Sequence, residues 1–463
     1  MKKTILLFLL FISGLGFTQD IKKDKAYKKR VLESIEIDFL TSYYNQEGSN
    51  ASVTGGIGNE DLEDINPTIV ISIPLNDDNV ITLDLGISTY TSASSSNGNP
   101  FDAENNINRT SSPWYASSGA SKVDEWKSLN IDYSHSSDDR NTVITANVSS
   151  ATEWDYESFG FGGGITKLFN NKNSSVSLIT KIYLDKWIPI YPKELDAYID
   201  AGRNLNSGFF NNRTIYNQQG IISNNWSPIK NFNLISDKSR NTYSVSFLFS
   251  QILNKNAQFA FFIDLIKQEG WLANPLQRVY FSDVNNFYIG NPSSISFYTS
   301  KSNKDVFHLA DDIERLPNSR IKIPVGLRFN YFLNENLTLR TYYRYYSDDW
   351  KINSHTLNLE FPIKLSDNFT FYPSYRFYTQ SKSKYFEPYD KHLSSSKYYT
   401  SDYDLSKFKS NQFGFGLQYV DIFTKLQIWE IGLKSVNLNY SNYKRNSDFK
   451  SNIVSIGLKF VID

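Results

Sequence analysis

The sequence predicts an all-β fold, a transmembrane antiparallel β-barrel of about sixteen strands with short periplasmic turns and long extracellular loops. Three observations support this prediction. Aromatic residues make up 16% of the chain, including 31 Tyr and 33 Phe, although the mean hydropathy of -0.43 is that of a polar protein. Apolar and polar residues alternate with a period of two over stretches of about ten residues, the length of a tilted membrane-spanning strand. Short polar turns alternate with long irregular segments along most of the chain.

The N-terminus has the features of a signal peptide over residues 1–19. Two lysines come first, an apolar stretch follows over residues 5–15, and small residues surround the expected cleavage site. The apolar stretch is too short to span a bilayer comfortably, and it is the only run of its kind in the sequence. The basic segment at residues 20–30 is expected to be a flexible, solvated periplasmic lead, and the barrel is expected to occupy residues 31–463.

Composition narrows the possible functions. Lys+Arg and Asp+Glu both number 48, so no net charge would attract nucleic acid or an anionic surface. Nucleic acid is therefore not an expected partner. The absence of cysteine excludes disulfides, thiolate metal sites, iron–sulfur clusters, a cysteine nucleophile and the lipidated cysteine of a bacterial lipoprotein. No cofactor or metal is expected, and a closed ladder of backbone hydrogen bonds in lipid is expected to supply the stability.

One-sided strands recur along the chain. The clearest is the last, in which every second residue from Val454 to Ile462 is apolar and the residues between them, except Val461, are small or polar. An even number of strands returns the C-terminus to the periplasm, as in single-chain bacterial barrels. The pattern is unclear at residues 422–430, so the count is about sixteen within two. In chain order, the predicted strands span residues 31–45, 66–75, 80–91, 127–136, 142–153, 158–169, 174–186, 241–252, 257–268, 319–333, 337–348, 352–364, 369–380, 411–423, 430–442 and 450–463.

The connections between these strands differ in length at the two ends of the barrel. Tight polar turns, such as residues 76–79 and 170–173, alternate with long segments rich in Ser, Asn, Gly and Tyr. The short turns are expected in the periplasm and the long loops outside the cell. The long loops are expected near residues 46–66, 91–126, 187–240, 271–319 and 381–410.

Several segments carry a family resemblance that spans nearly the whole mature chain. They are residues Thr91 to Pro100, Ser112 to Ala120, Tyr183 to Pro192, Leu316 to Val325, Tyr342 to Trp350 and Tyr398 to Ser406. In these segments the chain resembles DUF3570, a family of uncharacterised outer-membrane proteins of Bacteroidetes and other Gram-negative bacteria. The resemblance implies an outer-membrane barrel and supplies no catalytic residues.

If the apolar side chains face lipid, the opposite parity faces the lumen, and charged residues are distributed unevenly there. We hypothesise that one lumen wall is basic and the opposite wall acidic, so that a transverse field orients solutes or ions. The alternative is that these charges pair with each other and with inward-folded loops, and fill the barrel as a polar core. The basic set, with one acidic exception, is Lys322, Arg328, Arg340, Arg344, Arg376 and Glu360. The acidic set is Glu36, Asp38, Asp84, Asp132 and Asp264.

Other polar groups suggest weaker hypotheses. Acidic segments at residues 60–64 and 402–404 offer oxygen ligands for Ca²⁺, but neither has the spacing of a calcium loop. Asp311 and Asp312 near His308 make a still weaker transition-metal pattern, so no metal site is predicted. Aromatic clusters near strand ends are expected to form interfacial girdles, with sugar stacking beside Trp350 as the alternative.

Catalysis would need one of four histidines as a base, namely His135, His308, His355 and His392. His355 and its neighbour Ser354 face opposite sides of a strand, so they cannot hydrogen-bond directly. His135 lies near a periplasmic turn, which is a poor place for hydrolysis at the cell surface. No catalytic residue is predicted, and the protein is not expected to be an enzyme.

The function predicted from the sequence is an outer-membrane, porin-like channel for small polar solutes or ions. The first alternative is a plugged barrel that acts as a scaffold and binds another envelope protein. The second is an outer-membrane barrel hydrolase. Outer-membrane lipid is an expected partner under all three, because each hypothesis places the barrel in the same membrane.

Overall fold

The computed structural model describes residues 29–91, 123–230, 232–298 and 305–462. The predicted signal peptide at residues 1–19 lies outside the described residues, as does most of the basic lead and most of the predicted loop at residues 91–126. None of the helices in the described ranges is long and apolar enough to cross a membrane.

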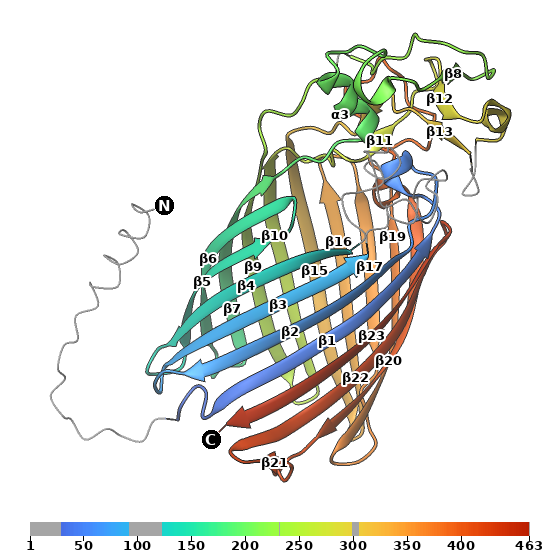
Figure 1. Cartoon of the computed structure of the whole chain (residues 1–463). Coiled ribbons are helices and arrows are strands. Elements are labelled where there is room, and N and C mark those ends of the chain that lie inside the picture. The colour runs from blue at the N-terminus through green and yellow to red at the C-terminus, as the bar shows by residue number, and fades with distance from the viewer. Residues whose placement is uncertain (1–28, 92–122, 231, 299–304, 463) are drawn as a thin grey trace, which may run out of the picture.

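The described chain forms a closed antiparallel β-barrel, which confirms the predicted fold class (Figure 1). The first and last strands close it, because Phe39 pairs with Leu458 in a ladder that runs from Ile35 to Gly48. Its main sheet has 18 strands, but β17 and β18 are successive parts of one strand and β21 is a short extension beside β22, so sixteen strands form the wall of the described barrel. They are β1 (Ile35–Gly48), β2 (Leu62–Pro74), β3 (Asn79–Thr91), β4 (Val123–Ser136), β5 (Thr142–Thr152), β6 (Tyr156–Phe169), β7 (Ser174–Trp187), β9 (Ser239–Asn254), β10 (Ala257–Gly270), β15 (Ser319–Asn334), β16 (Leu337–Asp348), β17 (Asn353–Glu360) with β18 (Ile363–Lys364), β19 (Phe369–Gln380), β20 (Phe408–Val420), β22 (Ile431–Arg445) and β23 (Phe449–Ile462).

Each predicted strand overlaps one of these sixteen, with two local differences. The strand predicted at 352–364 is interrupted between β17 and β18, where Pro362 has no N–H to donate to the ladder. The strand predicted at 411–423 ends at Val420 instead. Residues 421–430 form a separate turn that contains β21 (Gln427–Ile428).

The two ends of the barrel differ, as Figure 1 shows. Tight turns close one end, and the described long loops gather at the other. Residues 188–238 and 271–318 fold together there, and we call their described part the cap. The cap contains α3 (Lys193–Asp200), η3 (Gly208–Phe210), β8 (Ile215–Asn217), β11 (Arg278–Val279), β12 (Phe287–Gly290), η4 (Pro292–Phe297), β13 (Val306–His308) and β14 (Asp312–Ile313).

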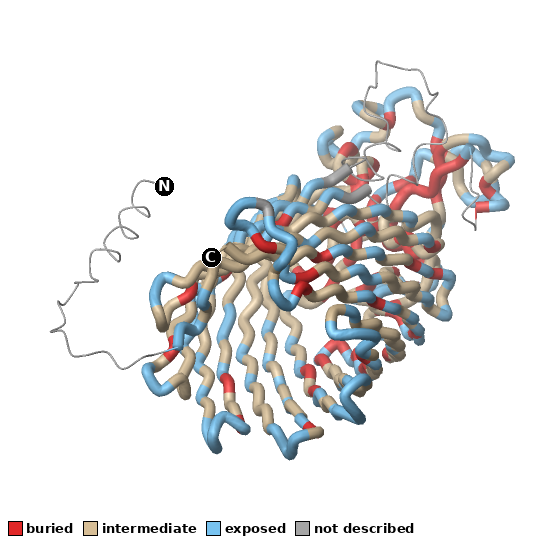
Figure 2. Tube along the Cα trace, turned by 90° about the horizontal axis from the view of Figure 1, so that it is seen from below, coloured by how far each residue is buried: buried red, intermediate tan, exposed pale blue. Residues whose placement is uncertain are grey.

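The cap has its own hydrophobic core, although the sequence predicted only irregular loops there. Leu195, Phe210, Trp226 and Leu309 are buried together in its largest cluster. Figure 2 shows the same contrast, because buried residues gather in the loop region while most of the barrel wall is intermediate or exposed. A wall one strand thick buries little by itself, whereas a folded cap excludes water from a core.

Candidate functional site: the polar barrel face and the capped rim

The cross-strand register sorts the barrel into two continuous faces. Alternate residues point to opposite sides of a strand, and each set lies beside its own kind in the next strand. Phe39, for example, pairs with Ile69 on one side and with Leu458 on the other. Large side chains of this apolar face remain exposed, including Leu265 at 56% and Phe413 at 63%. Water-soluble proteins rarely expose apolar surface so continuously. We call the opposite set the polar face.

Most residues of the predicted basic set cluster on neighbouring strands of the polar face. Lys322 and Arg328 lie on β15, Arg340 and Arg344 on β16, and Arg376 on β19. The ladders place Arg328 and Arg376 in one cross-strand row, joined through Tyr342 and Asn358. The next row contains Gly326, Arg344 and Thr356. Three guanidinium groups therefore share two adjacent rows of the wall.

Two aromatic rings lie beside Arg328 in this basic cluster. The guanidinium carbon of Arg328 lies 5.9 Å from the ring centroid of Phe262 and 5.7 Å from that of Tyr342. The two rings stack at 5.8 Å. Gly326 makes room for them, because a Cβ there would lie 2.1 Å from the Phe262 ring. Within the described residues Arg328, Arg344 and Arg376 form no ion pair, and Nε of Arg344 is shielded from solvent without a hydrogen-bond partner.

Other charges predicted for the lumen neutralise one another. Arg340 forms an ion pair with Glu360 at 2.8 Å. Glu36 forms ion pairs with Lys434 at 2.9 Å and with Lys459 at 2.6 Å, and Lys459 also lies 3.4 Å from Asp38. The two lysines were absent from the predicted set. The strand pairing brings the two lysines close to Glu36, because β1 pairs with β23, which in turn pairs with β22.

The acidic residues Asp84 and Asp132 lie across the barrel from the basic cluster. They belong to β3 and β4, and Asp132 accepts a hydrogen bond from Asn130. Six strands separate β4 from β16 in one direction, namely β5, β6, β7, β9, β10 and β15. Six also separate β17 from β3 in the other, namely β19, β20, β22, β23, β1 and β2. Asp264 differs, because it lies on β10, directly beside β15 of the basic side.

A cavity of about 500 Å³ opens on the polar face beside the Arg340–Glu360 pair. Apart from that pair, hydroxyl and amide groups supply its polar lining, including Gln412 and Asn439. Gly416 leaves room for the Asn439 amide, because a Cβ at position 416 would lie 2.2 Å from Oδ1 of that side chain. The cavity can therefore offer many neutral hydrogen-bonding groups to a solute.

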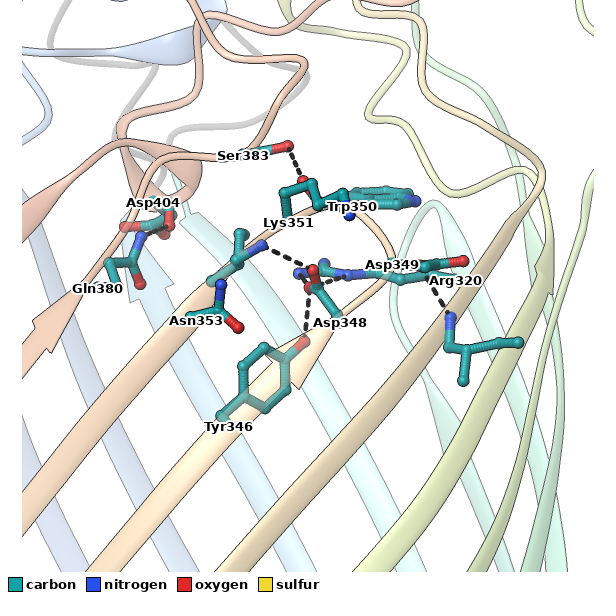
Figure 3. A network of polar contacts seen from close by, with 12 residues as sticks. Arg320, Tyr346, Asp348, Asp349, Trp350, Lys351, Asn353, Gln380, Ser383 and Asp404 are labelled. Carbon is teal, nitrogen blue, oxygen red and sulfur yellow. Dashed lines mark hydrogen bonds and ion pairs between the residues drawn. The ribbon is translucent and has the colours of Figure 1, made fainter.

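A polar network fixes the rim of the barrel where the strands meet the loops (Figure 3). Asp348 accepts hydrogen bonds from Arg320 at 2.5 and 2.9 Å and from the Tyr346 hydroxyl at 2.8 Å. The Arg320 guanidinium lies 4.3 Å from the Trp350 ring centroid. The backbone N–H of Lys384 donates to the carbonyl of Trp350 at 3.0 Å, which ties the loop after β19 to this rim. Because Trp350 is buried, it offers no ring surface for sugar stacking.

The cap is held by a buried ion pair between its two segments. Arg278 donates to both carboxylate oxygens of Glu194 at 2.7 and 3.1 Å. Its Nη1 also donates to the carbonyl of Val53 at 2.6 Å, which connects the cap to the loop between β1 and β2. Both ionic side chains are fully buried, and the short contact between them compensates charge that burial would otherwise make costly.

In the described chain the four histidines hydrogen-bond to Asn, Tyr or backbone groups. His308 stacks between Tyr280 and Tyr288, at centroid distances of 4.0 and 4.6 Å, and its burial lowers its pKa to about 3. The other three contact an Asn side chain, a Tyr hydroxyl and a backbone carbonyl. No hydrogen bond joins any of the four to a Ser or carboxylate side chain in the part of the chain that is described.

Carboxylates that were considered for metal binding form ion pairs and hydrogen bonds with protein groups. Asp312 pairs with Arg315 at 2.7 Å and accepts from the Tyr399 hydroxyl at 2.5 Å. Asp404 pairs with Arg445 at 2.7 Å. Among the described residues, no group of three or more His, Asp or Glu side chains is arranged to hold a metal ion.

Comparison with known families assigns the chain. The family model described as "Protein of unknown function (DUF3570)" matches residues 10–452. The chain belongs to the DUF3570 family. No curated protein matches this DUF3570 chain. Among solved structures, it is similar to a "Bacterial polysaccharide outer membrane secretin", with 9% identity, a TM-score of 0.42, and coverage of 93% of this chain and 99% of that one.

Two further solved structures resemble the DUF3570 barrel at low identity. One is the outer membrane protein opdK from Pseudomonas aeruginosa, at 9% identity and a TM-score of 0.37, covering 92% of this chain and 99% of that one. The other is a BenF-like porin from Pseudomonas fluorescens Pf-5, at 6% identity and a TM-score of 0.39, covering 93% and 100%.

The cap of this DUF3570 protein is expected to lose stability as pH rises. Burial raises the pKa of Asp311 and of Glu314 to about 8 each. Both therefore bind a proton more tightly in the folded cap than in the unfolded chain, so their contribution is fully present below about pH 4 and is lost as pH rises through about 8. Hydrogen exchange of cap peptides at pH 5 and pH 8, corrected for intrinsic rates, should show faster opening at pH 8. An Asp311→Asn, Glu314→Gln double variant should remove most of the difference, and an unchanged difference would contradict this assignment.

Proposed function

We propose that this protein is an outer-membrane channel that passes small polar solutes or ions, with the polar face lining its lumen and the apolar face in contact with lipid. The observation that supports the proposal best is the closed register. It joins exposed apolar residues into one continuous ring and gathers charged and amide groups on the opposite face. A barrel in lipid needs a closed ladder so that its backbone groups are paired within the wall. It also needs apolar side chains on the outside, while the inside can be polar.

The orientation follows from the same proposal. The tight turns would lie in the periplasm, and the cap would lie outside the cell. The N-terminal signal peptide proposed at residues 1–19 would direct export. In this orientation both ends of the barrel chain, near β1 and β23, lie on the periplasmic side.

The charge distribution supports a transverse field across the proposed lumen. Arg328, Arg344 and Arg376 lie without ion-pair partners on one side of the described barrel. Asp84 and Asp132 lie on β3 and β4, and at least five strands of the wall separate these two strands from those of the three arginines in either direction. Opposed fixed charges in a low-dielectric wall orient dipolar solutes and select ions. Glu36, Asp38, Arg340 and Glu360 contribute less, because they are already paired.

A second candidate is a barrel closed by its cap that serves as a scaffold for another envelope protein. The observation that favours it is the folded cap itself, with a hydrophobic core and a buried ion pair. A gate made of unstructured loops would not need either. The hydrolase alternative has no comparable support, because the described histidines contact neither a Ser nor a carboxylate side chain.

The proposal is tested by single-channel recording of the purified full-length protein in planar bilayers. Folding of the barrel is checked first by its heat-modifiable migration in gels. We expect conductance steps of reproducible size, and swelling of protein-containing liposomes in small sugars. A folded barrel that stays silent in both assays would overturn the channel proposal and favour the scaffold.

A further inference from the structure

One connection at the tight-turn end differs from the others in composition. Residues 421–430 join β20 to β22 and expose Ile422, Phe423, Leu426 and Trp429, with Phe423 at 76% and Trp429 at 94%. The other turns at this end are mainly Asn, Asp, Ser and Lys. Four large apolar side chains in one turn are therefore not explained by the need to close a hairpin.

The turn is folded rather than extended away from the barrel. The N–H of Asp421 donates to the carbonyl of Lys434 at 2.9 Å, and its buried carboxylate accepts from the N–H of Leu426 at 2.9 Å. The N–H of Leu433 donates to the carbonyl of Leu426 at 2.8 Å. These bonds bend residues 421–428 back along the start of β22.

Two residues of the turn adopt unfavourable backbone conformations. Thr424 has φ 49° and Trp429 has φ 58°, in the left-handed region that bulky and β-branched residues avoid. The close approach also requires Gly432, because a Cβ there would lie 2.2 Å from Cγ2 of Thr424. A Trp that is strained and almost fully exposed does not stabilise the isolated chain. Backbone strain of this kind, held at an exposed aromatic residue, points to a functional role for Trp429.

An apolar pocket lies beside this turn on the outside of the barrel. Its volume is about 570 Å³. Ile37, Leu433 and Phe460 belong to the apolar face of β1, β22 and β23, so the pocket is continuous with that face. The complete lining is Ile37, Leu426, Gln427, Ile431, Leu433 and Phe460.

We infer that residues 421–430 form a phospholipid-binding element: the pocket receives an acyl chain, Trp429 lies at the membrane interface, and Lys425 contacts the lipid phosphate. The inference rests on the proposed insertion of the barrel into a membrane. Continuity with the apolar face favours lipid over a protein partner, and indole rings favour the interface between hydrocarbon and water. Lys425 is exposed beside the Phe423 ring at 5.6 Å and forms no ion pair within the described residues, so its charge complements a phosphate.

The position of Trp429 is tested by fluorescence quenching in vesicles of phosphatidylcholine brominated at defined acyl positions. The chain has 8 Trp, so the signal of Trp429 is obtained as the difference between the wild type and Trp429→Phe. We expect this difference signal to be quenched at least twofold, most strongly by bromines near the headgroup. The control is Leu265→Trp in the Trp429→Phe background, which places an indole on the apolar face of β10.

The control separates the possible failures. If the indole introduced by Leu265→Trp is quenched and the Trp429 signal is not, the lipid-binding inference is wrong while the membrane proposal stands. A Trp429 buried against a protein partner or a second copy would give this same result. If neither signal is quenched, the barrel is not inserted and the proposed function fails with the inference.

The pocket and the phosphate contact are tested by native mass spectrometry of the detergent-solubilised protein with added phosphatidylglycerol. We expect Leu426→Asn and Lys425→Glu each to reduce the lipid-bound fraction at least twofold. Lys255→Glu is the matched control, because it makes the same charge change in the turn between β9 and β10 at the same end. Equal losses in Lys425→Glu and Lys255→Glu would show non-specific attraction and overturn the inference.

Discussion

Replacing Arg344 and Arg376 together by Glu is expected to reverse the ion preference of the channel. Both guanidinium groups lie in adjacent rows of the polar face, and neither forms an ion pair in the described chain. Like charges in a narrow, low-dielectric lumen can raise the local concentration of counter-ions by about tenfold or more. The wild type should therefore prefer anions on this side of the lumen, and the double variant should prefer cations.

The measurement is the reversal potential in a tenfold KCl gradient, at low ionic strength because salt screens charges within about 10 Å at 0.1 M. We expect the reversal potential to change sign in the Arg344→Glu, Arg376→Glu variant. The matched control is Lys172→Glu with Lys255→Glu, which changes net charge by the same amount in two exposed turns. A reversal potential that shifts equally in both variants would show that the basic cluster does not face the permeation path.

The same residues show what the sequence could and could not predict about the barrel. Strand order and face follow from period-two alternation, because a closed ladder requires every residue to face one side or the other. The faces of Arg344 and Asp84 could therefore be predicted. Their partners could not, because pairing depends on register. The sequence had no direct signal that Lys459, 423 positions after Glu36, would lie 2.6 Å from it.

The sequence did not predict that the cap is folded, and the reason is different. Its strands are short, such as β11 at two residues and β8 at three, so no periodicity develops. Its core is assembled from segments far apart in the chain, as with Leu195 and Leu309. Sugar stacking beside Trp350 was the alternative for that segment, but Trp350 is buried and the adjacent Asp348 forms an ion pair with Arg320 from the neighbouring strand. Contacts of this kind are set by tertiary packing, which local composition does not reveal.

Replacing Glu194 by Ala is expected to unfold the cap while the barrel remains intact. The change removes the carboxylate that Nε and Nη2 of the buried Arg278 guanidinium contact, and removing one member of a buried ion pair costs about 3–5 kcal/mol. At about 1.4 kcal/mol per tenfold, cap opening should increase by roughly two to three and a half orders of magnitude. Hydrogen exchange of peptides from residues 188–238 and 271–318 measures this directly, and strand peptides should not change.

Glu387→Ala is the matched control, because its ion pair with Lys382 at 2.6 Å is exposed and should contribute no more than about 1 kcal/mol. If Glu194→Ala leaves the cap as protected as this control, the buried pair does not hold the cap. The same variant then separates the two functional proposals. A larger conductance in Glu194→Ala would mean that the cap restricts the entrance of a channel. An unchanged conductance would mean that the cap leaves the path open, and a silent barrel even with the cap unfolded would leave the scaffold as the function of this fold.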